Sequence, residues 1–88
     1  MISRKYNGKS NVVGKKLKEI RIAKKLSQND LSDKLMLMGI DINSDGIYKI
    51  EKGTRILKDF ELSVICIALG IQETDLFNEF RKEVLKDA

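Results

Sequence analysis

QNDLSDKLMLMGIDINSDGIYKIEKGTR, residues 28–55, is the stretch that decides the fold. It predicts one helix, a turn and a second, short helix that ends at Gly53. The second helix carries almost no apolar side chain besides Ile47 and Ile50. A helix that buries so few residues is either marginally stable or presents its exposed face to a partner.

The segment before this stretch predicts a first helix and a defined start for the second. Apolar residues at helical spacing, including Leu17 and Ile20, indicate a first helix over residues 13–25 with one apolar side. Ser27 is the expected N-cap of the second helix, and Asp30 lies where a carboxylate completes a capping box. The second helix is therefore expected to begin directly after Ser27.

Within the deciding stretch, turn residues set the expected helix ends. Gly39 ends the second helix, residues 40–42 form a link, and Asn43 is the expected N-cap of the third helix. The third helix is expected to run to about residue 52, although Gly46 costs it about 0.5–1 kcal/mol relative to Ala. The residues expected to be buried on the second helix are Leu31, Leu35 and Met38.

The remaining sequence predicts two more helices. The fourth is expected to begin at Asp59 and end at Gly70, and the fifth to open at residues 74–75. Because Val64 and Ile67 make the fourth helix apolar nearly all round, it is expected to be the central helix. The residues spaced for burial are Leu62, Ile65, Cys66 and Leu69 in the fourth helix and Leu76, Phe77, Phe80 and Val84 in the fifth. The sequence therefore predicts an all-α fold of five helices around one core.

Length and composition indicate one small domain. Residues 1–11 are polar and lack periodicity, so they are expected to form a flexible basic arm, and residues 12–88 the folded domain. A single cysteine excludes an internal disulfide and fits a reducing compartment. No apolar run approaches the ~20 residues of a membrane span, and residues 1–14 lack the apolar core of a signal peptide. The expected location is the cytoplasm.

The composition argues against catalysis and metal binding. The chain has no His, which removes the usual general base and argues against a zinc site. There is no glycine-rich phosphate loop, and the carboxylates have no partner motif. Cys66 lies among apolar residues and is interpreted as a small core residue rather than a redox or metal-binding group. We therefore expect no enzyme activity, no metal and no cofactor.

Charge is distributed unevenly along the chain. Residues 1–25 hold nine Lys or Arg and one Glu, whereas residues 26–88 hold eight Lys or Arg and twelve Asp or Glu, for a net charge of +4. This distribution either orients the protein on a polyanion or reflects a solvated helix face next to a basic tail, and charge alone leaves both open. The exposed short helix favours a polyanion, with the major groove of DNA as the partner.

Three motifs resemble those of the Cro/CI-type helix-turn-helix domains, the lambda-repressor-like or XRE-family transcriptional regulators. They are Leu26-Ser27-Gln28-x-x-Leu31, Ile47-x-x-Ile50-Glu51-x-Gly53-x-Arg55 and Ile65-x-x-Ala68-Leu69-Gly70-Ile71, and the resemblance covers residues 13–77. The stretch between Leu31 and Ile47 is longer than in the commonest version and resembles a subgroup with an extended second helix. The resemblance implies a five-helix lambda-repressor-like domain that binds operator DNA, often as a dimer on palindromic half-sites, and usually represses transcription.

Helix geometry and the resemblance together predict which residues of the third helix face DNA. Lys49 can donate to guanine O6 and N7, and Asp45, one turn away, can accept from cytosine N4. Two alternatives stay open. Asp45 is also a favourable charge at a helix N-terminus. Tyr48 either packs on a thymine methyl group or a sugar, or covers the surface of the second helix. The expected base contacts are Ser44, Asp45, Tyr48 and Lys49.

A second group of residues is expected to contact phosphates. The resemblance implies that Gln28, in the first turn of the second helix, contacts a phosphate, where free backbone N–H groups favour an anion. The alternative for Gln28 is a polar capping residue. The cations after the third helix would make binding salt-sensitive, although Lys58 in particular also fits ordinary surface charge. The expected phosphate contacts are Gln28, Asn43, Lys52, Thr54, Arg55 and Lys58.

Two further assignments complete the expected functional unit. The resemblance implies that Arg21 and Glu51 form a structural pair that bridges the first and third helices. At the end of the fifth helix, Phe80, Val84 and Leu85 offer more apolar area than a core of this size needs. One short recognition helix reads only a few base pairs, so we expect a homodimer on double-stranded DNA with this apolar surface as its contact. The alternative is that these three residues simply cap the core.

Two other functions are weighed against sequence-specific DNA regulation. A helix-turn-helix protein-interaction module, such as an antirepressor or antitoxin-like partner, would dock through Leu76, Phe77 and Phe80. A nonspecific nucleic-acid binder would rely on the basic N-terminal quarter. Lys52 and Arg55 favour DNA over a protein partner, because a pure protein binder does not need cations beside the third helix.

Overall fold

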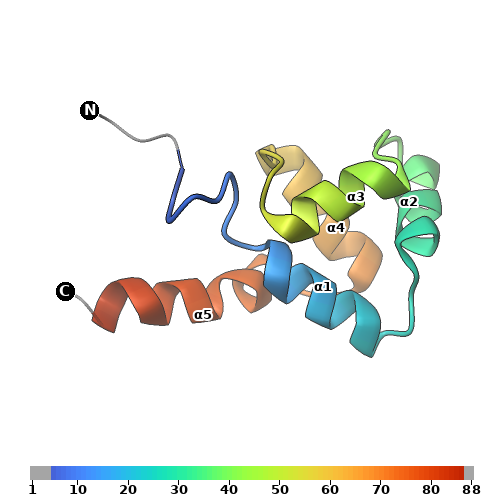
Figure 1. Ribbon diagram of the computed structural model, residues 1–88. Helices are drawn as coiled ribbons and strands as arrows, with labels where there is room; N and C mark the ends of the chain where they lie inside the picture. The colour runs from blue at the N-terminus through green and yellow to red at the C-terminus, as the bar shows by residue number, and fades with distance from the viewer. Residues whose placement is uncertain (1–4, 87–88) are drawn as a thin grey trace.

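The described part of the chain, residues 5–86 of the computed structural model, contains five α-helices joined by turns and loops (Figure 1). They are α1 (Gly14–Ala23), α2 (Gln28–Leu37), α3 (Ser44–Lys52), α4 (Asp59–Leu69) and α5 (Glu73–Lys86). This confirms the predicted all-α fold of five helices. Residues 1–4 of the predicted arm and residues 87–88 of the predicted domain lie outside the described residues. Among the described helices, none has both the length and the apolar character that a membrane span requires.

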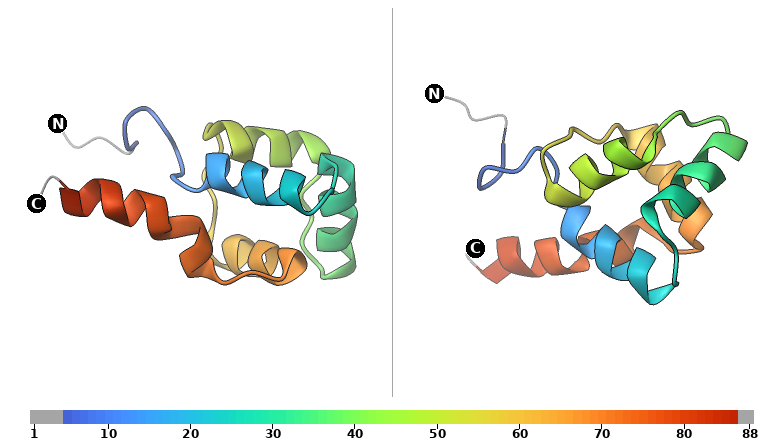
Figure 2. Two further views of the ribbon diagram at one scale, coloured as in Figure 1. Left: turned by 90° about the horizontal axis from the view of Figure 1, so that it is seen from below. Right: turned by 45° about the vertical axis from the view of Figure 1, so that its right-hand side comes forward.

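A single core lies between the helices, and α3 packs against both α1 and α2 (Figure 2). Burying each leucine or isoleucine contributes about 1.5–3 kcal/mol to folding relative to an exposed position. The core residues are Val13, Leu17, Leu31, Leu35, Ile42, Ile47, Ile50, Ile65, Cys66, Leu69 and Leu76. Because both isoleucines of α3 belong to this core, the opposite face of α3 is left to solvent.

The predicted caps account for the start of α2. The Ser27 hydroxyl accepts from the Asp30 backbone N–H (2.9 Å) and the Asp30 carboxylate accepts from the Ser27 N–H (2.8 Å), which confirms the capping box. The bond from the Ser27 N–H, followed by the Ser27 side chain, holds the pKa of Asp30 below its usual value. α1 ends at Ala23, earlier than predicted, because Lys25 adopts a left-handed conformation with φ +61° that interrupts the helix.

Local sequence also fixes both ends of α3. The Asn43 side-chain oxygen accepts from the Gly46 N–H at 2.8 Å, which confirms Asn43 as the N-cap. Gly53 follows the last residue of the helix with φ +80°, a left-handed conformation that glycine adopts without a Cβ penalty. The third helix therefore begins and ends where its caps predict.

Several apolar residues predicted to be buried or central lie at the surface. Met38 is 40% exposed, because α2 ends at Leu37 and the chain turns away at Gly39. Ile67 is 64% exposed and Val64 is half-buried, so α4 covers one side of the core and the prediction of a central fourth helix is wrong (Figure 2). A chain of this length builds too few layers to cover a helix on all sides.

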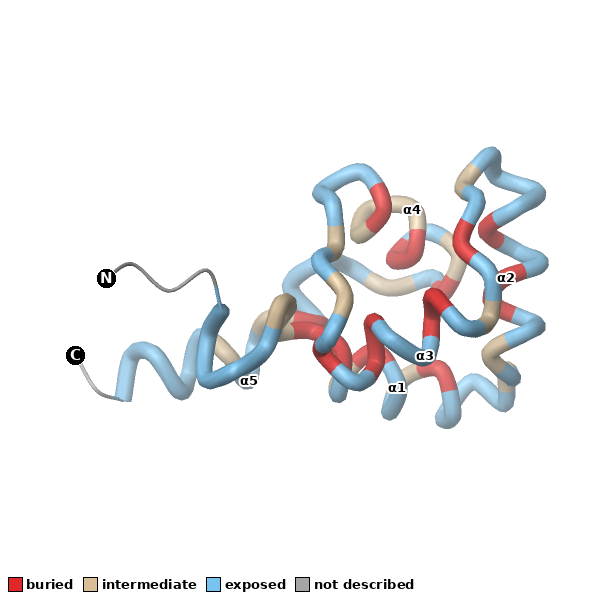
Figure 3. The backbone as a smooth tube through the Cα atoms, turned by 45° about the horizontal axis from the view of Figure 1, so that its top comes forward, coloured by how far each residue is buried: buried red, intermediate tan, exposed pale blue. Residues whose placement is uncertain are grey.

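The C-terminal half of α5 extends away from the body of the protein (Figures 1 and 3). Leu76 near its start is 1% exposed, Phe77 and Phe80 are half-buried, and Val84 is 44% exposed. The prediction that one whole side of the fifth helix is spaced for burial is therefore wrong for Val84. The reason is that the core ends before the helix does.

Residues 5–11, predicted as part of a flexible arm, contain a tight turn near the end of α3 (Figure 1). Tyr6 and Lys9 exchange backbone N–H···O hydrogen bonds of 2.9 Å each, and Asn7 and Gly8 between them have φ +48° and +78°. Two consecutive left-handed residues are typical of the two-residue hairpin turn for which Asn-Gly is the strongest sequence signal. The boundary between arm and domain at residue 11 stays a prediction.

Candidate nucleic-acid interface

α3 presents a polar face to solvent while its two isoleucines are fully buried. Asp45, Tyr48 and Lys49 are exposed, and Ser44 at the start of the helix is half-buried. Residues 38–43 join α2 to α3, so this face lies on the second helix of a helix, turn, helix unit. In such units the second helix is the one that enters the major groove.

Two weak contacts hold the long side chains on this face. Lys49 Nζ lies 3.0 Å from Asp45 Oδ2, and both side chains are more than half exposed. Lys52 Nζ lies 5.2 Å from the centre of the Tyr48 ring. An exposed ion pair of this spacing contributes about 0.3–0.5 kcal/mol, and an exposed cation–π contact about 0.5–1 kcal/mol. Both contacts are therefore weak enough to be exchanged for contacts with bases or phosphates.

Gln28 and Asn43, both expected to contact phosphates, make hydrogen bonds within the protein. Gln28 Nε2 donates to Glu51 Oε1 at 3.1 Å. The Asn43 side-chain oxygen is the acceptor that caps α3. These side chains therefore help to place α2 and α3, and the amide group of Asn43 retains its N–H donors for a further partner.

A buried ion pair joins α1 to α3. Arg21 Nε and Nη2 donate to the two carboxylate oxygens of Glu51, at 2.6 and 3.1 Å, and Arg21 Nη1 donates to the Leu26 carbonyl at 2.7 Å. The Arg21 and Glu51 side chains are only 8% and 2% exposed. With Gln28 on the same carboxylate, the pair ties α1, α3 and the start of α2 together. Its main contribution is orientation, because desolvation of two charges offsets much of their attraction.

A second ion pair, which the sequence did not predict, holds Arg55. Arg55 Nη2 lies 3.2 Å from Glu61 Oε2, and Glu61 is only 6% exposed. Glu61 Oε1 also accepts from the Lys58 N–H at 3.0 Å, at the start of α4. The position of Glu61 three residues after Lys58 is a capping signal that could have been recognised. Arg55 is therefore held by the protein as well as placed after α3.

This second ion pair explains the glycine in the first turn of α3. A Cβ atom on Gly46 would lie 2.5 Å from Arg55 Nη1 and 2.9 Å from Ile42 Cγ2. The absence of a side chain therefore lets Arg55 pack against the helix. The propensity cost predicted for Gly46 is offset by this tertiary packing.

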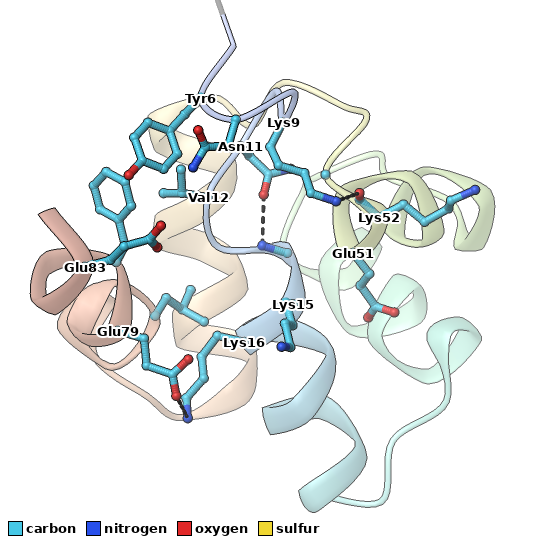
Figure 4. Close-up of a pocket in the computed structure, with 15 residues that line it drawn as sticks. Tyr6, Lys9, Asn11, Val12, Lys15, Lys16, Glu51, Lys52, Glu79 and Glu83 are labelled. Carbon is cyan, nitrogen blue, oxygen red and sulfur yellow. Dashed lines mark hydrogen bonds and ion pairs between the residues drawn. The ribbon is translucent and has the colours of Figure 1, made fainter.

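The other residues expected to contact phosphates lie at the surface. Lys52, Thr54 and Lys58 are exposed, and the Thr54 hydroxyl donates to the Lys49 carbonyl at 3.2 Å. Lys9, which was not among the predicted site residues, also lies here: its Nζ donates to the Lys52 carbonyl at 3.2 Å (Figure 4). The end of α3 therefore carries ammonium groups from two distant parts of the chain.

An open groove of about 350 Å³ lies between the N-terminal turn, the start of α1, the end of α3 and α5 (Figure 4). The Tyr6 and Phe80 rings meet edge to face at its border, with centroids 5.0 Å apart. Lys16 Nζ lies 3.6 Å from Glu79 Oε1, which links α1 to α5. The mixed charge and open shape distinguish this groove from the enclosed, mainly apolar pockets that hold small ligands.

Of the three residues that a protein-interaction module would use on α5, Leu76 and Phe77 belong to or pack against the core, and Phe80 packs against the Tyr6 ring. Leu76 is buried, and Phe77 and Phe80 are half-buried, so the hypothesis of a docking surface made by these three residues is not favoured. Val84 and Leu85, further along the helix, are 44% and 64% exposed. The exposed apolar surface of α5 therefore lies near its C-terminal end.

A solvent-exposed polar face on the second helix of such a unit, fixed to α1 by a buried ion pair, defines the class of helix-turn-helix DNA-binding domains. A family model described as helix-turn-helix matches residues 17–76. The chain belongs to this family of lambda-repressor-like, XRE-type DNA-binding regulators. The match extends from α1 to the start of α5 and confirms the resemblance that the sequence motifs indicate. The comparisons with curated proteins and with solved structures gave no match.

Proposed function

We propose that this protein is a sequence-specific regulator that reads operator DNA with α3 and represses transcription. The observation that carries the proposal is the exposed face of α3, where Asp45, Tyr48 and Lys49 project from a helix whose isoleucines are buried. Repression needs no further surface, because a domain bound to an operator excludes other proteins from the same duplex. In this role the protein works in the cytoplasm.

Charge supports DNA as the partner. The net charge is +4, and nine of the seventeen Lys and Arg residues lie in residues 1–25. Each lysine or arginine that neutralises a phosphate releases counterions, so affinity for DNA is expected to fall as salt rises. The proposed base contacts are Ser44, Asp45, Tyr48 and Lys49, and the proposed phosphate contacts are Gln28, Asn43, Lys52, Thr54, Arg55 and Lys58.

Lys49→Ala is expected to weaken binding to the cognate duplex by about 1–3 kcal/mol and to relax base preference at one position. Within the protein, the Lys49→Ala substitution removes only an exposed ion pair with Asp45. A loss of this size therefore reports a lost base contact rather than lost folding. Competitive fluorescence-anisotropy titrations against single-base variants of the duplex measure both effects.

Lys52→Ala is the matched control, because it removes the same charge from the next turn of α3. It is expected to weaken cognate and random duplexes about equally and to reduce the slope of log affinity against log salt by about one unit. Unchanged affinity and unchanged base preference in Lys49→Ala would contradict the role of α3. An unaltered salt slope in Lys52→Ala would remove that residue from the phosphate contacts.

The proposed functional unit on DNA is a symmetric homodimer. One α3 of nine residues reads only a few base pairs, and two-fold symmetry doubles the sequence that is read. The proposed contact surface is Phe80, Val84 and Leu85, on the part of α5 that extends from the body (Figure 3). Val84 and Leu85 are its exposed apolar side chains, next to the half-buried Phe80, and a second copy of the chain would cover them.

Analytical ultracentrifugation with a short operator duplex is expected to show two chains per duplex, with half-site centres about 34 Å apart or a multiple of that distance. Leu85→Glu puts a charge on the apolar surface and is expected to reduce the complex to one chain per duplex. Lys82→Ala, an exposed position on the same helix, is the control and is expected to keep two. A wild-type complex of one chain per duplex at saturation would refute the dimer.

A further inference from the structure

Asn11 uses the full hydrogen-bonding capacity of its side chain to join three parts of the chain. Its Oδ1 accepts from the N–H group of Gly14 at 2.9 Å, at the start of α1 (Figure 4), and from the N–H group of Val13 at 3.1 Å. Its Nδ2 donates to the carbonyls of Ile50 at 3.0 Å and Arg55 at 2.8 Å. Two acceptor lone pairs and two amide hydrogens are all that this side chain offers. One amide group therefore connects α1, α3 and the loop before α4.

The end of α3 depends on donors from outside the helix. The last carbonyls of a helix have no partner within it. Here Lys9 Nζ donates to the Lys52 carbonyl at 3.2 Å, and the Ser10 N–H donates to the Gly53 carbonyl at 2.7 Å. Residues 9–11 therefore cap the end of α3. The hydrogen bonds from Asn11 are part-buried, whereas the one from Lys9 is exposed.

The surrounding contacts leave this cap little freedom to move. α1 approaches α3 so closely that a Cβ atom on Gly14 would overlap the Ile50 carbonyl oxygen. On the other side, the Tyr6 ring packs edge-on against Phe80 of α5 and holds the hairpin turn that leads to Asn11. A change in the length or charge of the Asn11 side chain is therefore expected to shift the end of α3 relative to α1.

We propose that Asn11 is a positioning residue for DNA recognition. It acts through α3: by fixing the C-terminal end of that helix against α1, it sets the direction in which Lys49 and its neighbours project. Recognition groups need to be held within about 0.5 Å of their productive geometry for full discrimination. The inference rests on the proposed function, because the position of α3 affects specificity only if α3 reads bases.

Two substitutions separate the capping role of Asn11 from its positioning role. Asn11→Asp keeps an acceptor oxygen for the start of α1 but has no N–H for the carbonyls of Ile50 and Arg55. Asn11→Ser keeps a capping hydroxyl without adding a charge, and its side chain is too short to reach both carbonyls. If the charge in Asn11→Asp prevents folding, hydrogen exchange and DNA binding are measured on Asn11→Ser alone.

Hydrogen exchange tests the positioning in the absence of DNA. The reporters are the N–H groups of Gly53 and Thr54, which donate to the carbonyls of Ile50 and Lys49 at 2.9 and 3.0 Å. In Asn11→Ser both are expected to exchange about tenfold faster than in the wild type, because the end of α3 opens more often. Equal protection of both groups in the variant and the wild type would overturn the proposal.

Asp75→Ala is the matched control for this experiment. It removes the hydrogen bond of 2.9 Å from the Gln72 N–H to the Asp75 carboxylate, a cap at the start of α5. The control removes a side-chain hydrogen bond at the start of another helix but leaves the end of α3 intact. Its exchange rates at Gly53 and Thr54 are expected to match those of the wild type.

DNA binding tests the consequence for recognition. The readout is the ratio of the affinity for the cognate duplex to the affinity for a random duplex. It is measured under conditions in which circular dichroism shows that each variant has the helix content of the wild type. Asn11→Ser is expected to lower this ratio about tenfold, and Asp75→Ala to leave it unchanged. An unchanged ratio in Asn11→Ser, beside a selective wild type, would refute the role of Asn11 alone. A wild type that prefers no duplex would refute the proposed function and this role together.

Discussion

Glu51→Ala is expected to lower the free energy of unfolding by about 3–5 kcal/mol. The Glu51 carboxylate accepts from Arg21 Nε and Nη2 and from Gln28 Nε2, and the Arg21 side chain is only 8% exposed. Its removal leaves a buried guanidinium charge with the Leu26 carbonyl as the acceptor that remains. The loss measures an uncompensated buried charge rather than the net value of the pair. Urea denaturation followed by circular dichroism determines it.

The double variant Arg21→Met/Glu51→Met is the control for this loss. It is expected to recover most of the stability, because apolar side chains of similar length replace both charges. If the ion pair mainly orients α3, this folded double variant also discriminates poorly between cognate and random duplexes. If the free energy of unfolding of Glu51→Ala lies within about 1 kcal/mol of the wild-type value, the ion pair is not buried as described. A loss that small is typical of exposed ion pairs.

Gly14→Ala is expected to lower the free energy of unfolding by about 2–3 kcal/mol. The new Cβ atom would overlap the Ile50 carbonyl oxygen and lie 2.9 Å from the Glu51 carbonyl oxygen. Both are backbone atoms of α3, so α1 and α3 must separate to make room. Helix propensity alone predicts the opposite sign, a gain of about 0.5–1 kcal/mol for alanine within a helix. The sign of the effect therefore decides between local propensity and helix packing.

Lys18→Ala provides the control for Gly14→Ala in the same helix. Lys18 is exposed, and its replacement is expected to change stability by less than about 0.5 kcal/mol. Both variants are compared with the wild type by urea denaturation at one temperature and salt concentration. A Gly14→Ala variant as stable as Lys18→Ala would contradict the close approach of α1 to α3.

Features that depend on neighbouring residues in the chain were predictable from the sequence. Ser27 and Asn43 follow capping rules that involve only a few residues, and Gly53 follows the rule for helix ends. Ile47 and Ile50 gave the buried side of α3, because the period of a helix determines which side chains share a face. These local rules place the candidate recognition helix and its exposed face.

Two tertiary contacts were not predictable from the sequence. Glu61 pairs with Arg55, six residues before it, and Asn11 reaches the carbonyl of Ile50 from a position 39 residues earlier. The Arg21–Glu51 pair, 30 residues apart, was expected only because of the family resemblance. A polar residue near a helix start can make several local hydrogen bonds, so its type and spacing do not reveal distant partners. The Asn-Gly pair at residues 7–8 did carry a signal for the hairpin turn that brings this segment into place.

The exposure of α4 was unpredictable for a different reason. Its sequence is apolar on nearly all sides, yet Phe60 and Ile67 are 53% and 64% exposed. Apolar periodicity tells which residues share a face of a helix. It does not tell how many of those faces are buried, because that depends on how many other helices are available to pack around the helix.

Selection of binding sites from random duplex DNA tests the central claim, that α3 reads a base sequence. The wild-type protein is expected to enrich one motif with two symmetric half-sites, and Lys49→Ala to enrich the same motif with one position relaxed in each half. The absence of any enriched motif, or an identical motif at equal enrichment with Lys49→Ala, would contradict the claim.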